Sequence, residues 1–267
     1  MSLVLPVDAD RHRLQTWPAF LYDLVPQGPD AQARRHFIVK RPRGPSEADR
    51  KVLRNEARYM KVAQRFGIRS FALPALHGDM LFIPRFDRHA QDGRVLRFHQ
   101  ESAACIAGLG GFGIQANQFD LIAAIRKVVN APLDETIEFI QRDVLNLAMR
   151  NPDNHARNTA VHTVDGVTRI TPLFDFAPMY LDPEGITRAA RWYHLETNKE
   201  LQRWDDILAH LALPTSEHRQ LVESLVRFGE QMAALPECMR EMEVDGDIVH
   251  FVMPSIEAQR AQLLALR

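Results

Sequence analysis

Two short apolar runs and one amphipathic stretch organise the first third of the chain. Residues 36–40 and 80–86 are apolar runs that predict strands, and the first of them ends at Arg41-Pro42. Residues 46–66 predict a helix, because Ser46 is a suitable N-cap and acidic residues fill the first turn. The apolar residues of this helix recur at spacings of three and four, which forms one face: Leu53, Ala57, Met60 and Ala63.

Beyond residue 88 the apolar positions recur at helical spacing. The expected helices span residues 96–109, 119–129, 133–149, 199–211, 216–234 and 254–266. The third of them stops before Asn151-Pro152, because a residue that precedes proline avoids the helical conformation. A β-containing front portion followed by a mostly helical back portion predicts an α+β protein with two lobes.

One hairpin is predicted inside the helical portion. Asp165-Gly166 separates two β-rich runs, and this dipeptide favours a tight turn because both of its residues need positive φ. Pairing Val164 with Val167 sets the register of the two strands. Extending this register along the two strands places Asn158 approximately opposite Leu173, two residues from Asp175. The hairpin therefore predicts that the side chains of Asn158 and Asp175 converge on one point.

Asp153, Asn158 and Asp175 together have the chemistry of a phosphoryl-transfer site. One aspartate can orient or deprotonate an acceptor hydroxyl, while an asparagine and a second aspartate hold Mg²⁺ against nucleotide phosphates. The alternative is structural. Residues 151–154 are also ordinary turn residues, and an aspartate after a strand is usually a cap.

Composition restricts the remaining classes. The 267 residues are 46% hydrophobic and 25% charged, which is ordinary for a globular protein. The formal net charge of −1 does not favour non-specific binding to nucleic acids or membranes. Cys105 and Cys238 form no metal-binding spacing. The N-terminal apolar run Leu3-Val4-Leu5 is too short for a signal peptide, and no apolar run approaches the ~18 residues of a membrane span. We therefore expect a cytoplasmic protein.

Lys40 and Glu56 extend the predicted site into the front portion. In protein kinases a lysine on a strand contacts the nucleotide phosphates and pairs with a glutamate on the following helix. Lys40 ends the first apolar run, and Glu56 lies on the predicted helix that follows it. The alternative is a surface lysine with a snorkelling side chain and an unrelated, solvated glutamate.

At this point the chain resembles the HipA family of bacterial serine/threonine kinases, including its shorter HipT-like members. The matching pieces run in order through most of the chain up to about residue 180. They are Trp17-Pro18-Ala19-Phe20-Leu21, Phe37-Ile38-Val39-Lys40, Asn55-Glu56-Ala57, Pro84-Arg85-Phe86-Asp87-Arg88, Asn151 to Asn158, and Pro172-Leu173-Phe174-Asp175.

The resemblance assigns roles to these residues. It implies that Asp153 is the catalytic aspartate, that Asn158 and Asp175 are the magnesium ligands, and that Lys40 binds the nucleotide phosphates. It also implies an interlobe hinge whose backbone meets adenine, formed by Pro84, Arg85 and Phe86. Asp87 would approach the ribose. His155 would belong to the nucleotide-side loop, or else brace that loop by donating to a backbone carbonyl.

By the same resemblance we expect a protein-kinase-like fold that uses ATP and Mg²⁺. Residues 1–88 would form an incomplete, nucleotide-binding N-lobe, and residues 89–267 a helical C-lobe. The activity would be that of a serine/threonine protein kinase, the toxin of a toxin–antitoxin system. Family targets include aminoacyl-tRNA synthetases among translation factors, and the antitoxin partner is a small DNA-binding protein.

One departure from the family pattern concerns the phosphate-covering loop. Family members carry a Gly/Ser-rich loop before the lysine strand, whereas this chain has only Gly28 between Trp17 and Phe37. We expect a break or an implausibly long peptide link between Gln27 and Phe37, since such loops are mobile. The departure motivates one alternative to an active protein kinase, a nucleotide-binding pseudokinase that acts as an interaction module. A kinase for a small molecule is a second alternative, because it would use the same site residues.

Overall fold

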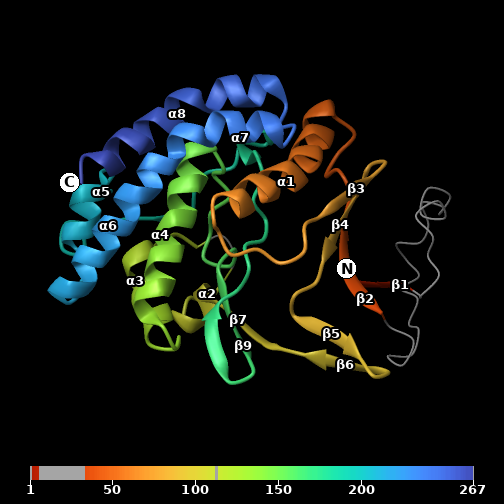
Figure 1. Ribbon diagram of the computed structural model, residues 1–267, viewed down its shortest axis with the longest axis horizontal. Helices are drawn as coiled ribbons and strands as arrows, with labels where there is room; N and C mark the ends of the chain where they lie inside the picture. The colour runs from red at the N-terminus through yellow and green to blue at the C-terminus, as the bar shows by residue number, and fades with distance from the viewer. Residues whose placement is uncertain (1, 6–33, 112–113, 267) are drawn as a thin grey trace.

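The computed structural model describes residues 2–5, 34–111 and 114–266. Figure 1 shows most strands gathered on one side of the molecule and most helices on the other, with helix α1 between them. The expected break between Gln27 and Phe37 lies largely outside the described residues, as do Trp17 and Gly28.

The front portion of the chain forms a four-stranded antiparallel sheet in the order β1-β2-β4-β3. Its strands span Ser2–Leu5 (β1), Arg35–Lys40 (β2), Met80–Pro84 (β4) and Ala75–His77 (β3). The two strands that were expected from apolar runs are thereby confirmed. Lys40 pairs with Leu81 in the sheet, so the lysine stands at the end of β2.

Helix α1 (Glu47–Arg65) joins the sheet to the rest of the molecule. Ser46 is its N-cap, as predicted, and forms a capping box with Asp49, in which each side chain accepts the other's backbone N–H. Leu53 packs with Leu81 in a small cluster against the sheet. Further along the helix, a second set of apolar residues enters the large core: Tyr59, Met60, Val62 and Ala63. The helix therefore holds Glu56 between two packed surfaces.

The helix expected at residues 96–109 is wrong. The first part of this region is strand, formed by the end of β6 (Arg94–Arg97) and by β7 (His99–Ser102), and only the short helix α2 (Ala103–Ile106) lies within it. Strand β5 (Arg88–Gln91) precedes β6. Asp92 and Gly93 have φ of 51° and 70° and close the β5–β6 hairpin. Strand β7 is held by pairing with a strand far along the chain, and local spacing cannot register such pairing.

The hairpin predicted around Asp165-Gly166 is confirmed in its register. Strands β9 (Ala160–Val164) and β10 (Val167–Ile170) pair with Val164 opposite Val167. Both turn residues have positive φ, 50° and 77°. These strands form a three-stranded sheet in the order β10-β9-β7, while β8 (Ala116–Asn117) and β11 (Ala190–Arg191) form a short parallel pair.

The back portion is built on packed helices, among which α4, α6 and α8 contact one another. The helices span Gln118–Arg126 (α3), Pro132–Ala148 (α4), Trp204–Ala209 (α5), Thr215–Gln231 (α6), Leu235–Glu241 (α7) and Gly246–Leu264 (α8), with 3₁₀ turns at Met179–Leu181 (η4) and Met232–Ala234 (η5). None of the helices in the described ranges has the length and apolar character that crossing a membrane requires.

Some predicted helix bounds are wrong. Helix α8 begins at Gly246, well before the expected start at Pro254, and α7 was not expected. Pro254 is exposed, so its missing N–H lies on the solvent side while the opposite face packs into the core through Ile248, Val252 and Ile256. Packing of that face outweighs the local preference against proline. Helix α5 begins at Trp204, later than residue 199.

Candidate active site

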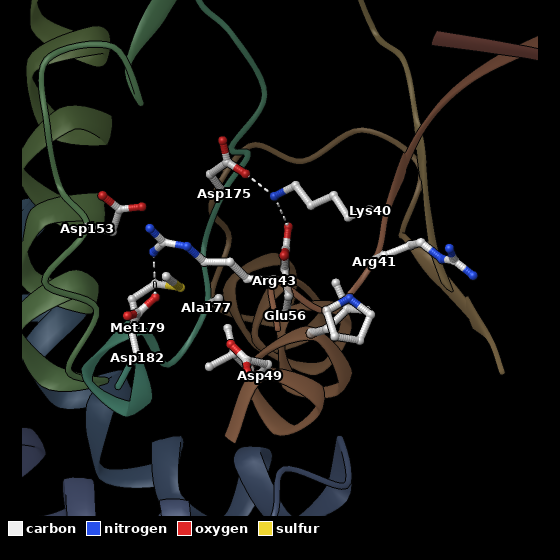
Figure 2. A pocket seen from close by; sticks show the side chains of 13 residues that line it. Lys40, Arg41, Arg43, Asp49, Glu56, Asp153, Asp175, Ala177, Met179 and Asp182 are labelled. Carbon is white, nitrogen blue, oxygen red and sulfur yellow. Dashed lines mark hydrogen bonds and ion pairs between the residues drawn. The ribbon is translucent and has the colours of Figure 1, made fainter. Parts of the chain in front are cut away.

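Lys40 contacts both Glu56 and Asp175, the two acidic residues that were predicted to share its site. Its Nζ donates to Glu56 Oε1 at 2.7 Å and also to Asp175 Oδ1. Figure 2 shows the ammonium between the two acids, one on α1 and the other in the loop that follows β10. Lys40 and Asp175, to which the sequence analysis assigned the nucleotide phosphates and the magnesium ion, are therefore in direct contact.

The charges of this cluster stabilise one another. Burial lowers the pKa of Lys40, but the two carboxylates outweigh that effect and raise the pKa above its ordinary value. Burial raises the pKa of Glu56 and the charge of Asp175 adds to this, while Lys40 opposes both. The cluster therefore consists of an ammonium group, charged at neutral pH, held between two acidic side chains.

Turn chemistry in the loop after α4 holds Asp153. The Oδ1 atom of Asn151 accepts the N–H of Asp153 at 3.3 Å, and Asn151 Nδ2 donates to Asn146 Oδ1 at 2.9 Å. Asn158 Nδ2 donates to the Asp153 carbonyl at 2.7 Å. The structural and catalytic interpretations of this loop are thus compatible, because the turn presents the Asp153 side chain.

The Asp153 carboxyl group has a raised pKa. Burial is the main cause, and the negative charge of Asp175 adds to it, while His155 and Lys40 act in the opposite direction. Its side chain is 30% exposed, so a solvent-borne group can still reach it. A carboxylate with a raised pKa accepts a proton more readily than an ordinary aspartate does.

Asp175 has an unusual backbone conformation, and hydrogen bonds from two arginines hold the chain just before it. Its φ is +53°, a left-handed conformation that aspartate tolerates better than most residues. Upstream, Arg69 Nη1 donates to the Ile170 carbonyl at 2.7 Å, and Arg142 Nη2 donates to the Thr171 carbonyl at 2.8 Å. The charged residues beneath β10 therefore fix the strand that leads to Asp175.

The donor set of Asn158 and Asp175 suits magnesium. Because Nδ2 of Asn158 is engaged with Asp153, its Oδ1 is the atom suited to a cation, and the Asp175 carboxylate supplies a second hard oxygen. Among the described residues, no group of three or more His, Cys, Asp or Glu side chains is arranged to hold a metal ion. The convergence of Asn158 and Asp175 on one ion stays a prediction.

His155 braces the loop through contacts other than the expected one. Its Nδ1 accepts the N–H of Arg157 at 3.3 Å, instead of donating to a carbonyl, and its own carbonyl accepts the N–H of Asn158 at 2.9 Å. This assigns the ring proton to Nε2 in the neutral form. His155 Nε2 lies 3.6 Å from Asp153 Oδ1. A role toward the nucleotide stays a prediction.

The expected hinge follows β4, and its groups already have partners within the chain. Pro84 pairs with Phe37, and the N–H of Arg85 donates to the His36 carbonyl at 2.9 Å, so this N–H belongs to the sheet. The ring of Phe86 lies 6.0 Å from those of both His162 and Phe174. The Asp87 carboxylate accepts from Arg85 Nε at 2.7 Å and from Arg88 at 3.3 Å. Although burial raises its pKa, these arginines hold the pKa of Asp87 below its ordinary value.

A cavity of about 170 Å³ joins Lys40, Glu56, Asp153 and Asp175 in one lining. Arg43 also lines it and reaches across to Asp182 at 2.9 Å and Glu184 at 2.6 Å. Figure 2 shows the Arg43 guanidinium beside Asp182, on the Asp153 side of the cavity. The cavity thus brings together the lysine, the glutamate and both aspartates that the sequence predicted for one site.

Comparison with known proteins decides the family. Residues 12–233 match the family of HipA-like C-terminal domains. The chain belongs to this family. The HipA-like chain is 24% identical to a protein of Sinorhizobium fredii named "Putative kinase Y4mE". The matched stretch of 229 residues covers 79% of this chain and 53% of the relative. The chain therefore spans about half the length of this curated relative.

Solved structures confirm the expected fold. HipA of Shewanella oneidensis, determined in complex with HipB and operator DNA, has a TM-score of 0.61 at 17% identity, covering all of this chain and 71% of that one. The proinflammatory kinase CtkA of Helicobacter pylori has a TM-score of 0.56 at 13% identity, covering 87% of this chain and 89% of that one. The HipA-like chain therefore has the α+β, kinase-like fold that the sequence predicted.

Sequence reasoning missed a buried carboxylate that organises this HipA-like site. Asp143 on α4 accepts from Asn154 Nδ2 at 2.6 Å, from Trp192 Nε1 at 2.8 Å and from Gln118 Nε2 at 3.3 Å, and it pairs with Arg188. A signal was present in the sequence, because Asp143 follows Ile140 by three positions and so falls on the apolar face of the helix. A carboxylate on a buried face needs partners.

Proposed function

We propose that this HipA-like chain is an ATP- and magnesium-dependent protein kinase that phosphorylates a serine or threonine hydroxyl. One observation carries the proposal: Lys40 is paired with both Glu56 and Asp175, at a cavity that Asp153 also lines. A lysine that bridges a helix glutamate and an aspartate after a strand is the arrangement on which kinases rely to position nucleotide phosphates.

Each residue has a distinct role in the proposed reaction. Glu56 orients the Lys40 ammonium toward the nucleotide phosphates. Asn158 and Asp175 would hold Mg²⁺, which when bound neutralises charge on the phosphates. Since Asp175 also pairs with Lys40, that contact would loosen as the phosphates and the metal ion take over both partners.

Asp153 would act on the acceptor. Its carboxylate orients the acceptor hydroxyl and takes up the proton as the oxygen bonds to the γ-phosphorus. The bond between the γ-phosphorus and the bridging oxygen breaks, and ADP leaves with the electron pair. The raised pKa of Asp153 fits this role, because the group must accept a proton during transfer.

The biological setting follows from similarity and is also a proposal. HipA of Shewanella oneidensis was solved with HipB and operator DNA, so we assign this chain the part of a cytoplasmic toxin with a small DNA-binding antitoxin as partner. Its acceptor would be an aminoacyl-tRNA synthetase or another translation factor. Residues 1–88 and 89–267 would be the two lobes that close on ATP.

Mass spectrometry of a cell lysate tests the proposal. The lysate is incubated with the protein, ATP and Mg²⁺, and compared with an Asp153→Ala control. New phosphoserine or phosphothreonine in one or a few proteins, absent from the control, supports a protein kinase. Phosphate on a metabolite indicates a small-molecule kinase, and nucleotide binding without transfer indicates a pseudokinase. Either outcome overturns the proposal.

A further inference from the structure

We infer that Arg43 is a second phosphate-binding residue of this site, which contacts the γ-phosphoryl group and makes the site selective for a nucleoside triphosphate over a diphosphate. This inference rests on the proposed kinase function and adds to it a residue that the sequence analysis did not assign. Arg43 is then a catalytic residue, because it touches the group that is transferred.

Arg43 stands at the junction of two hollows. The first is the cavity that Lys40 and Asp175 line, and the second has a volume of about 460 Å³ and adjoins the first at Asp153. Of the residues that the structure describes, Asp153 and Arg43 alone line both hollows. Phosphoryl transfer requires the acceptor hydroxyl to meet the γ-phosphorus at the catalytic aspartate. The γ-phosphoryl group therefore belongs at this junction, whereas Lys40 reaches the phosphates from within the first hollow.

Lys40 shows how a phosphate-binding cation is held in this site. One of its acids, Glu56, has a buried side chain and orients the ammonium. The other, Asp175, is partly exposed and gives way to the phosphates in the proposed reaction. A buried acid keeps its cation because separating the two would leave a buried charge unpaired, while an exposed acid is exchanged easily.

Arg43 has the same kind of partners. Its Nη1 donates to Asp182 Oδ2 at 2.9 Å, and the Asp182 side chain is only 4% exposed. Its Nη2 donates to Glu184 Oε2 at 2.6 Å, but the Glu184 side chain is 72% exposed. An ion pair as exposed as this contributes little to stability. A phosphate can therefore replace Glu184 on Nη2 while Asp182 continues to hold the guanidinium.

The turn that carries Asp182 and Glu184 is closed by its own hydrogen bonds. Oδ1 of Asp182 accepts the N–H of Glu184 at 2.9 Å, and the Asp182 carbonyl accepts the N–H of Gly185 at 3.0 Å. These bonds leave Oδ2 of Asp182 directed at Arg43. Asp182 lies seven residues after Asp175, so one segment supplies both the predicted magnesium ligand and the acid that orients Arg43.

A guanidinium suits the γ-phosphoryl group by its shape and charge. Its N–H donors form a planar fork that matches two phosphate oxygens, and it stays protonated throughout the pH range of a folded protein. Negative charge spreads over the equatorial oxygens during transfer, so an arginine at those oxygens stabilises the transition state as well as the bound nucleotide. ADP lacks the γ-phosphoryl group. The assignment of Arg43 therefore predicts discrimination between ATP and ADP.

Calorimetric titration of the full chain with ADP and with a non-hydrolysable ATP analogue, both with Mg²⁺, tests this inference. Arg43→Met should weaken binding of the analogue about tenfold, as for the loss of one charge-assisted hydrogen bond, and leave the affinity for ADP unchanged. The rate of transfer from ATP should fall by at least about 10²-fold. Arg50→Met is the matched control, because Arg50 is an exposed, acid-paired arginine of α1 that lines neither hollow. It should change neither the affinities nor the rate.

Glu184→Gln is a second variant, and it leaves the fold intact because the side chain is exposed. It removes a carboxylate that competes with phosphate for Nη2 of Arg43. Binding of the ATP analogue should therefore strengthen about threefold, the size of an exposed ion pair, with the affinity for ADP unchanged. Weaker binding of the analogue would show that Glu184 is needed to hold Arg43, which overturns the inference.

The outcomes separate this inference from the proposed function. If Arg43→Met changes the affinities for ADP and for the analogue by the same factor, or changes neither, Arg43 does not contact the γ-phosphoryl group and the kinase stands. If the unaltered protein binds neither nucleotide, or transfers no phosphoryl group to any acceptor, the kinase itself is overturned.

Discussion

Asp143 Oδ1 accepts a hydrogen bond of 2.6 Å from the side chain of Asn154, the residue that follows Asp153. The other carboxylate oxygen accepts from Trp192 Nε1 at 2.8 Å. One buried acid on α4 thus ties the loop of Asp153 to the segment around Trp192, although about 40 residues separate the two along the chain. The position of Asp153 depends on a residue that would never touch the substrate.

Asp143→Asn should therefore lower both stability and turnover. The substitution removes the counter-charge of Arg188, whose side chain is only 12% exposed, so we expect a loss of about 3 kcal/mol in the free energy of unfolding. We also expect a fall in kcat with little change in nucleotide affinity, because Lys40 and Asp175 are unaffected. Urea denaturation and steady-state kinetics measure the two effects.

Asp134→Asn is the matched control for Asp143→Asn. It removes an exposed acid from the first turn of the same helix and should cost at most about 1 kcal/mol through the helix dipole. Equal effects of the two substitutions on kcat would show that Asp143 has no special link to the loop.

Asp175→Asn should weaken the magnesium-dependent part of ATP binding. The variant keeps the size of the side chain but offers the cation a neutral oxygen in place of a carboxylate. Calorimetric titration of ATP with and without Mg²⁺ measures the difference. Asp165→Asn, in the turn of the same hairpin, should leave that difference unchanged, because asparagine tolerates the positive φ found there. If Asp175→Asn keeps the full magnesium dependence, Asp175 is a structural residue.

Glu56→Gln should raise KM for ATP while the fold persists. Gln keeps the shape but loses the charge that holds the Lys40 ammonium at 2.7 Å, so the lysine is positioned by Asp175 alone. We expect an increase of about tenfold, as for the loss of one charge-assisted hydrogen bond. Steady-state kinetics at varied ATP give the value, with the exposed Lys127→Met as a control for charge changes elsewhere. If the KM of Glu56→Gln for ATP equals that of the wild type, Glu56 has no role in nucleotide binding.

Asp153→Asn should make the protein more stable at neutral pH. The folded-state pKa of Asp153 is raised, so folding favours its protonated form, and ionisation destabilises the fold as pH rises through the window between the unfolded and folded pKa values. Above the folded pKa that cost is fully present, and below about 3.9 it is absent. The Tm of Asp153→Asn should therefore exceed that of the wild type at pH 7, and the difference should vanish near pH 3.

Calorimetry at both pH values measures this difference. A lower Tm for Asp153→Asn at pH 7 would mean that the carboxylate stabilises the fold, and the raised pKa would then be incorrect.

The sequence predicted the parts of the site whose spacing is local. The hairpin register followed from Asp165-Gly166, because turn chemistry acts over a few residues. Lys40 and Glu56 followed from a strand and the next helix, and the structure brings them together at 2.7 Å. Asp175 joined them because its distance from the hairpin turn is set by strand geometry.

What the sequence did not reveal depends on contacts between distant segments. Asp143 meets Arg188 only through the packing of α4 against the segment after Asp175, which no local pattern records. The strand β7 was mistaken for helix because its pairing with β9 lies far along the chain. The bond from the Arg85 N–H to His36 within the sheet also joins segments far apart in the sequence, and the hinge role of Arg85 stays a prediction.

The rate of transfer of a radiolabelled γ-phosphoryl group by Asp153→Asn, relative to the wild type, tests the central claim most directly. Both proteins are compared at saturating Mg²⁺ and ATP, with nucleotide affinities expected to agree within roughly an order of magnitude, because Asp153 acts on the acceptor. A fall in the transfer rate of at least about 10²-fold, the contribution of one general base, is the predicted result. Transfer at the wild-type rate would remove Asp153 from the mechanism and contradict the assignment of this site as a kinase centre.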